Sequence, residues 1–129
     1  MVRRNIMDQT TKKIIAAAIE VHRHLGPGLP ESVYRDCLCR ELEEAGLKVE
    51  RDRDLHIEYK GVQLGGSYPM DLLVAEEAAV VIKATDRVDP VSEARLRTQM
   101  KLSRLNRGLI INFYVTTMKH GIICLSRKE

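Results

Sequence analysis

Large aromatic side chains are scarce in this chain of 129 residues: it contains no Trp, and Phe113 is its only Phe. Proteins that hold single-stranded nucleic acid without sequence preference stack the bases on aromatic rings. Base stacking is therefore not expected to be the main mode of any nucleic-acid contact. The chain also has no apolar run near the roughly 20 residues that a membrane-spanning helix needs, and no apolar signal segment at its N-terminus. We expect no membrane contact.

Cysteine is rare as well, since only Cys37, Cys39 and Cys124 are present. Cys37 and Cys39 are two residues apart in a predicted helix, so their side chains point to different faces and cannot pair. The spacing matches no metal-binding knuckle. Reduced thiols of this kind are typical of a soluble cytoplasmic protein.

Three common catalytic motifs are missing: the G-x-x-x-x-G-K-[ST] phosphate loop, H-E-x-x-H and G-x-S-x-G. The 21 Lys and Arg against 18 Asp and Glu give a net charge of +3. This mildly basic balance permits a phosphate-bearing partner but does not require one. The apolar fraction of 44% is enough for one core. We predict a single domain over residues 1–129, with residues 1–10 as a flexible arm.

Periodicity predicts an α/β fold with a mixed central β-sheet flanked by helices. The first helix is expected to start at a Thr10 or Thr11 cap and to end near Leu25, before Gly26. Two more helices are predicted over about 30–45 and 91–104. Strands are predicted by alternation over about 47–59 and by apolar runs at 67–75, 78–84, 108–115 and 121–126. The helix predicted between the strands at 78–84 and 108–115 favours a parallel crossover there. The short connections earlier in the chain favour antiparallel pairing.

Two ionisable residues interrupt apolar strands, namely Asp71 and Lys83. A charge inside a sheet is costly unless it is paired or binds a ligand. A hairpin turning near residues 76–77 puts Asp71 and Lys83 almost opposite each other and, with a three-residue turn, on one face. Two interpretations stay open: a partly buried ion pair, or a catalytic acid with a lysine that stabilises a transition state.

Other candidate residues have a structural interpretation beside the functional one. His22 lies on the apolar stripe of the first helix, and Tyr34 lies on the stripe of the second. Each is either a core residue with its polar atom hydrogen-bonded or part of a binding pocket. A basic run in and after the third helix is either a solvated face or a stripe that faces phosphates. The run consists of Arg95, Arg97, Lys101, Arg104 and Arg107.

Several separated motifs appear in a characteristic order. Gly28-Leu-Pro-Glu31-Ser-Val-Tyr34 fits the pattern G-x-x-E-x-x-Y, and Val21-His22-Arg-His-Leu25-Gly-Pro-Gly28 precedes it. Tyr68-Pro-Met-Asp71-Leu-Leu-Val74, Val80-Val-Ile-Lys83-Ala84 and Gly108-Leu-Ile-Ile-Asn112-Phe113 follow. Over residues 12–126 the chain resembles the GxxExxY group of small proteins in the PD-(D/E)XK nuclease superfamily.

The resemblance implies a restriction-endonuclease-like core and a metal-dependent phosphodiester hydrolase. In that superfamily an Asp and the Glu of an E-x-K element bind Mg²⁺, the Lys orients water or stabilises phosphate charge, and a Glu from the first helices often joins them. Carried over by motif, these positions are Asp71, Lys83 and Glu31, with Asp71 and Glu31 as the remaining metal ligands. A strand alternates its side chains, so E and K of E-x-K share one face.

The chain departs from the pattern at its polar positions. Val81 stands where E-x-K has its glutamate and cannot bind a metal. Pro69 replaces an arginine two residues before Asp71. The third helix of the group usually carries His, Gln and Tyr at the positions where this chain has Ser92, Arg95 and Gln99. Near the C-terminus, Cys124 stands in place of an arginine. The apolar scaffold is kept, which indicates a changed pocket rather than general drift.

We therefore predict a nuclease-fold protein with a degraded catalytic site that holds no cofactor tightly. Binding of nucleic acid or phosphate would use Lys83 and Arg95, with Gln99, Ser92, His22 and Tyr34 as further binding candidates. One alternative is an active Mg²⁺-dependent nuclease with a relocated carboxylate, taken from Glu76, Glu77 or Glu93. The other is a non-catalytic interaction module, such as a homodimer, or an engineered scaffold with a rebuilt pocket.

Overall fold

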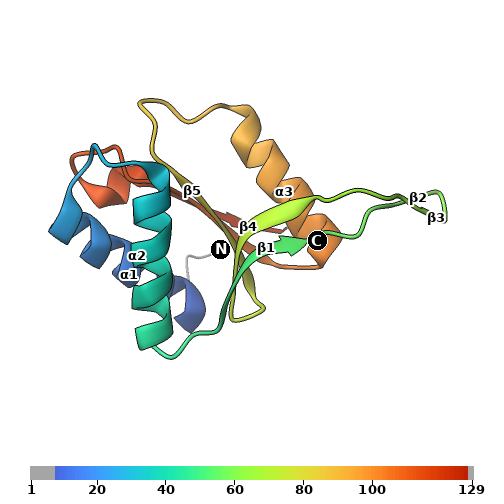
Figure 1. Cartoon of the computed structure of the whole chain (residues 1–129), viewed down its shortest axis with the longest axis horizontal. Helices are drawn as coiled ribbons and strands as arrows, with labels where there is room; N and C mark the ends of the chain where they lie inside the picture. Colours follow the sequence, from blue (N-terminus) through green and yellow to red (C-terminus); the bar gives the residue numbers. More distant parts are fainter. Residues whose placement is uncertain (1–7, 128–129) are drawn as a thin grey trace, which may run out of the picture.

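The computed structural model of the protein describes residues 8–127, which form a five-stranded sheet with helices on both faces (Figure 1). The helices are α1 (Gln9–Leu25), α2 (Glu31–Glu44) and α3 (Val91–Ser103), with a short 3-10 helix η1 (Met118–Gly121). The strands are β1 (Val49–Asp54), β2 (Glu58–Tyr59), β3 (Val62–Gln63), β4 (Pro69–Val74), β5 (Ala78–Lys83), β6 (Arg107–Asn112) and β7 (Ile122–Ser126).

Helix α1 is capped by Asp8, whose carboxylate Oδ1 accepts a hydrogen bond from the Thr11 N–H at 2.7 Å. The predicted Thr10 or Thr11 cap was wrong. Both threonines are buried in the first turn, and the Thr10 hydroxyl donates to Glu77 at 2.6 Å. Asp is among the best N-cap residues, and it stands one turn earlier in the chain. Residues 9 and 10 of the predicted arm are therefore helical, and residues 1–7 of that arm lie outside the described residues.

The Asp8 cap makes stability depend on pH. Partial burial would raise the pKa of Asp8, but the Thr11 N–H and the Arg107 guanidinium outweigh this and hold it below its ordinary value. A lowered folded-state pKa stabilises the protein above the unfolded pKa of about 3.9, and this contribution is lost as pH falls through the folded pKa.

Asp8→Asn, which keeps a capping oxygen without a titratable charge, should cost a few tenths to about 1 kcal/mol at pH 7. Urea unfolding of both proteins at several pH values checks this. The difference between them should shrink below pH of about 3.9 and close as the pH falls through the lowered pKa of Asp8. An unchanged difference at low pH would mean that the charge of Asp8 adds nothing.

The sheet has the order β1-β4-β5-β6-β7, in which only β5 and β6 are parallel. Helix α3 forms the crossover between them, as right-handed β-α-β connections do. The predicted mixed sheet is thus confirmed. The alternation over about 47–59 corresponds to two separate elements, because β1 ends at Asp54 and Tyr59 lies in the separate β2–β3 hairpin. This hairpin projects from the body as an arm (Figure 1), and 61% of the Tyr59 side chain is exposed.

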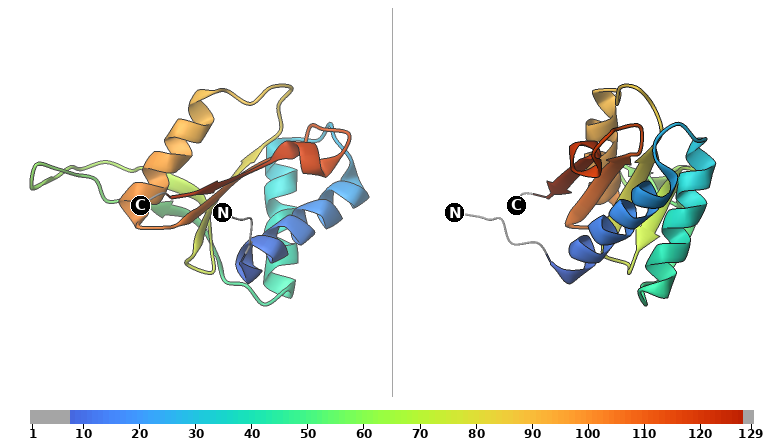
Figure 2. Two further views of the ribbon diagram at one scale, coloured as in Figure 1. Left: turned by 180° about the vertical axis from the view of Figure 1, so that it is seen from behind. Right: turned by 90° about the vertical axis from the view of Figure 1, so that its left-hand side faces the viewer.

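The two faces of the sheet carry separate cores, because α1 and α2 cover one face and α3 covers the other (Figure 2). On the first face Tyr34 and Phe113 stack with ring centroids 4.5 Å apart, and both are fully buried. Around them lie Ile14, Ala18, Val21, Leu38, Leu42, Leu72, Val74, Val80, Ile82, Leu109 and Ile111. The smaller core under α3 contains Met70, Leu73, Ala79, Leu96, Met100, Leu105, Ile110 and Leu125.

Helix α3 approaches β6 closely at Gly108. A Cβ at this position would come within 2.5 Å of the Met100 sulfur and 3.1 Å of Leu96. The missing side chain therefore sets how near α3 lies to the sheet. Within residues 8–127, no helix is both long and apolar enough to cross a membrane.

Candidate functional site

A pocket of about 300 Å³, which we call the β4–β5 pocket, collects residues from both helix layers and three strands. The structure thereby brings together the predicted residues Glu31, Asp71, Lys83, Ser92, Arg95 and Gln99. The remaining lining residues are Arg35, Asp52, Pro69, Val81, Ile82 and Leu96. Residues that lie up to 68 positions apart in the sequence thus meet at one place, as the motif pattern predicted.

Regular strand pairing is interrupted on both sides of Asp71. Toward β5, the last paired residues are Leu72 and Val80. Toward β1, the register passes from Arg51–Leu72 to Arg53–Met70 and leaves out Asp52, which has a left-handed φ of 54°. Aspartate tolerates this conformation better than most residues. The two gaps let the Asp71 carboxylate turn into the space between the strands.

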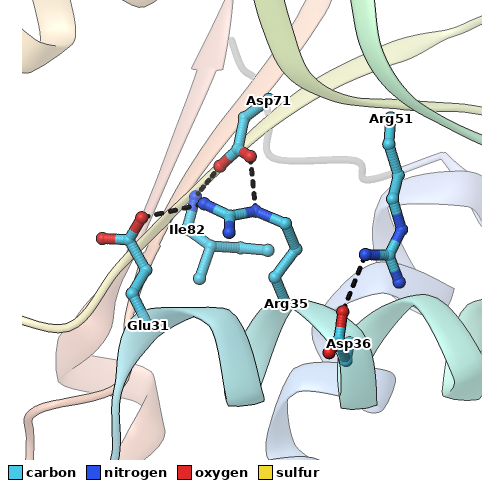
Figure 3. A network of polar contacts seen from close by, with 6 residues as sticks. All are labelled: Glu31, Arg35, Asp36, Arg51, Asp71 and Ile82. Atoms are coloured by element: carbon cyan, nitrogen blue, oxygen red, sulfur yellow. Dashed lines mark hydrogen bonds and ion pairs between the residues drawn. The ribbon is translucent and has the colours of Figure 1, made fainter.

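Both carboxylate oxygens of Asp71 have partners there (Figure 3). Oδ2 accepts from the Ile82 backbone N–H at 2.9 Å, and Oδ1 accepts from Arg35 Nε at 2.7 Å. The Asp71 side chain is 17% exposed. The predicted ion pair between Asp71 and Lys83 is not formed, because the partner of Asp71 is an arginine on α2.

The register of the hairpin explains this difference. Residues 75–77 connect Val74 to Ala78, so the turn is centred on Glu76. Continuing the pairing of Leu72 with Val80 puts Asp71 opposite Val81, and Lys83 lies two residues further along β5. Asp71 and Lys83, predicted to be almost opposite each other, are thus two residues out of direct opposition, and both line the same pocket.

Arg35 is the main residue that the sequence did not reveal. Its Nη2 donates to Glu31 Oε2 at 2.8 Å, so one guanidinium joins the carboxylates of Glu31 and Asp71 (Figure 3). Burial would lower the pKa of Arg35, but its hydrogen bonds and the charges of Asp71 and Glu31 outweigh burial and raise it. The i, i+4 spacing of Glu31 and Arg35 is visible in the sequence. The link to Asp71 depends on tertiary structure.

The residues of the β4–β5 pocket do not fit a Mg²⁺ ion. Hard cations take about six oxygen ligands, several of them from carboxylates. Val81 provides no oxygen and instead packs against the core under α3. Glu31 and Asp71 already share Arg35. Among residues 8–127, no group of three His, Cys, Asp or Glu side chains lies close enough together to hold a metal ion.

The carboxylates that could have replaced the missing glutamate lie elsewhere. Glu76 pairs with Lys48 at 2.8 Å, Glu77 accepts from Thr10, and Glu93 lies 3.5 Å from Arg97. None of the three lines the β4–β5 pocket. The extra acid at the pocket is Asp52, which sequence reasoning missed because it stands in a run of alternating charges.

The opposite side of the pocket is basic and polar. Within the described part of the chain, neither Lys83 nor Arg95 makes an ion pair. The Ser92 side chain is 4% exposed, and its Oγ has no hydrogen-bond partner among these residues; neither has the buried Oε1 of Gln99. A buried polar atom without a partner costs about 1–3 kcal/mol and calls for a ligand or water. This side can therefore accept a polar group from outside.

Asn112, at the end of β6, is a second residue that sequence reasoning did not single out. Its Oδ1 accepts from the backbone N–H groups of Thr85 and Tyr114, and its Nδ2 donates to the Thr85 carbonyl at 3.0 Å. Asn112 thereby fixes the segment that follows Lys83 and leads to α3. This buried amide was visible only as one letter of a motif.

His22 and Tyr34 lie outside the β4–β5 pocket. His22 Nε2 is 2.7 Å from the Val115 carbonyl oxygen. The Tyr34 hydroxyl donates to the Gly26 carbonyl and accepts from the Leu29 N–H. Tyr34 thus holds the corner between α1 and α2, and His22 ties α1 to the segment after β6, which is the structural interpretation of each.

The basic run does not form one stripe. Arg95 faces the β4–β5 pocket, whereas Arg97 and Lys101 line a second hollow with Met100 and Arg127. Arg107 pairs with Asp8 at 2.9 Å. Of the basic run, only Arg95 is brought to the predicted site.

Comparison with known proteins agrees with this arrangement. The family model described as PD-(D/E)XK nuclease superfamily matches residues 8–125. Comparisons with curated proteins and with solved structures give no match. The match spans all three helices, and the mixed sheet with helices on both faces is consistent with the core of that superfamily. The chain therefore belongs to the PD-(D/E)XK nuclease superfamily.

Proposed function

We propose that the protein is a non-catalytic member of this superfamily that binds a phosphate group of nucleic acid in the β4–β5 pocket. The observation that carries the proposal is that the pocket holds the buried hydroxyl of Ser92 together with Lys83 and Arg95, two cations without a counter-ion among residues 8–127. Phosphate oxygens accept strong hydrogen bonds from such charged donors.

The loss of catalysis is supported by the acidic side of the pocket. Metal-assisted hydrolysis needs a cation that polarises the phosphodiester and activates water. Val81 offers no ligand, and the carboxylates of Glu31 and Asp71 are engaged by Arg35. Lys83 remains in its motif position, where an ammonium attracts phosphate whether or not hydrolysis follows.

Binding can be separated from cleavage by mutation of the two cations. Lys83→Ala and Arg95→Ala should each weaken binding of fluorescent single- or double-stranded DNA and RNA. Each should also reduce the slope of log affinity against log salt by about 0.7–0.9, because each phosphate contact releases a counter-ion. Fluorescence anisotropy over a salt series measures both quantities.

Arg40→Ala is the matched control. Its side chain is 81% exposed on α2, and it pairs with Glu44 away from the pocket. It removes the same charge and should leave the salt slope unchanged. Equal losses for all three variants, or binding that does not depend on salt, would contradict a phosphate site. No binding at all would favour the interaction-module alternative.

The same nucleic acids, incubated with Mg²⁺ or Mn²⁺, test the non-catalytic part of the proposal. We expect no cleavage above that of the Asp71→Ala variant. Cleavage that disappears in Asp71→Ala would show an active nuclease instead.

We also propose membership of the GxxExxY group. The roles of the motif residues support it: Glu31 begins α2 beside Arg35, and Tyr34 ties the preceding turn through Gly26 and Leu29. The three-residue spacing makes Glu31 and Tyr34 neighbours on one side of α2, where Glu31 lines the pocket and Tyr34 is buried in the core.

A further inference from the structure

We infer that the guanidinium of Arg35 takes the place of the divalent cation in the β4–β5 pocket. It pairs with both Asp71 and Glu31, offsets part of their negative charge and keeps metal ions out. The inference concerns only the acidic side of the pocket. It therefore does not rest on the phosphate binding proposed for Lys83 and Arg95, and it can fail independently.

Arg35 contacts two carboxylates at once, as a bridging metal ion would. Arg35 donates from Nε to Asp71 at 2.7 Å and from Nη2 to Glu31 at 2.8 Å, so it joins a strand to a helix (Figure 3). The second oxygen of Asp71 is taken by the Ile82 N–H. A metal ion that used Asp71 and Glu31 would have to break two charge-assisted hydrogen bonds and displace Arg35.

The charges lead to the same conclusion. Two carboxylates drawn to one place repel each other unless a positive charge lies between them. Arginine stays protonated in proteins, so its charge does not depend on pH or on the supply of metal. The Arg35 and Asp71 side chains are 24% and 17% exposed, which leaves the pair little screened by water. Arg35 thus fixes the acidic side without an ion from solution.

A second Arg–Asp pair, between Arg51 on β1 and Asp36 on α2, offers a matched control. Arg51 donates to Asp36 at 2.7 Å, the same distance as for Arg35 and Asp71 (Figure 3). These side chains are 44% and 67% exposed and do not line the pocket. Arg51→Gln therefore removes an arginine and an ion pair of equal length without touching the site.

The test is the thermal stability of the wild type, Arg35→Gln and Arg51→Gln with and without millimolar MgCl₂ or MnCl₂, at matched ionic strength. Arg35→Gln should melt below the wild type without metal and recover part of the loss when metal is added. The wild type and Arg51→Gln should not respond. By calorimetry, Arg35→Gln should bind Mn²⁺ at least about tenfold more tightly than the wild type, because a positive charge near the ion has been removed.

Two results would overturn the inference. One is saturable Mn²⁺ binding by the wild type with the affinity of Arg35→Gln. The other is a folded Arg35→Gln that does not respond to metal.

If Arg35→Gln does not fold, NMR of the wild type tests the inference instead. The Arg35 Nε–H and the Ile82 amide should resist hydrogen exchange and show no selective broadening by traces of Mn²⁺. Selective broadening of these two signals, or rapid exchange of the Arg35 Nε–H, would overturn the inference. Loss of nucleic-acid binding in Lys83→Ala bears only on the proposed function, since that variant should stay as indifferent to metal as the wild type.

Discussion

Val81→Glu is expected to create a binding site for Mg²⁺ or Mn²⁺. Val81 lines the β4–β5 pocket with Asp71 and Lys83, and the β4–β5 register extended by one pair puts it opposite Asp71, so the variant adds the missing carboxylate of E-x-K there. A full negative charge about 4 Å from a divalent ion contributes about 2 kcal/mol even at the dielectric constant of water. Calorimetry should therefore detect a gain in Mn²⁺ affinity of at least about thirtyfold.

The effect should be larger when Arg35 is also removed. In Val81→Glu/Arg35→Gln the three acids Glu31, Asp71 and Glu at position 81 face the ion without a competing guanidinium. Val62→Glu, on the exposed arm, is the control for an added charge, since 60% of the Val62 side chain is exposed away from the pocket. If neither Val81→Glu nor the double variant binds metal more tightly than Val62→Glu, the assignment of position 81 is wrong.

Phe113→Ala should destabilise the protein by about 3–5 kcal/mol, the usual cost of removing a buried Phe. Phe113 is fully buried, directly follows β6 and stacks on Tyr34, so the change opens a cavity between the sheet and α2. Domains of this size have a free energy of unfolding of about 5–15 kcal/mol, so a large part of it would be lost. Urea unfolding at pH 7 measures the change.

Ile123→Ala is the matched control on β7. The Ile123 side chain is 38% exposed, and a surface change of this kind usually stays within about 0.5 kcal/mol. A loss for Phe113→Ala as small as that of Ile123→Ala would mean that the stack with Tyr34 does not hold α2 to the sheet.

The sequence was most informative where hydrophobic periodicity and turn residues agreed. Gly26 and Gly46 punctuate the ends of the first two helices, and the apolar runs around Asp71 and Lys83 correspond to β4 and β5. It was less informative where local signals conflicted. Alternation over about 47–59 left open whether one strand or two form there, and the chain leaves the sheet after Asp54 to form the β2–β3 hairpin. Period-two patterning does not distinguish a sheet strand from an exposed hairpin.

The motifs picked out residues that share one pocket, but they did not reveal the partners of these residues. Six of the predicted residues line one pocket, because order along the chain fixes which strands and helices meet. The partner of Asp71 depends on the side-chain direction of Arg35 and on the break in pairing at Asp52, and neither has a local signal. His22 and Tyr34 illustrate the opposite case, in which a motif residue serves the fold.

The unequal size of the two cores has a consequence for how the pocket moves. Helix α3 rests on the smaller core, and the Asp89 carboxylate accepts from its first backbone N–H, that of Val91, at 2.9 Å. Elements with fewer buried apolar groups open locally at a lower free energy than the rest of a domain. We expect α3 to open before β4 and β5. Ser92, Arg95 and Gln99 would then move away from the pocket together. A bound anion would lose its contacts with them, while Arg35 would stay hydrogen-bonded to Asp71 and Glu31.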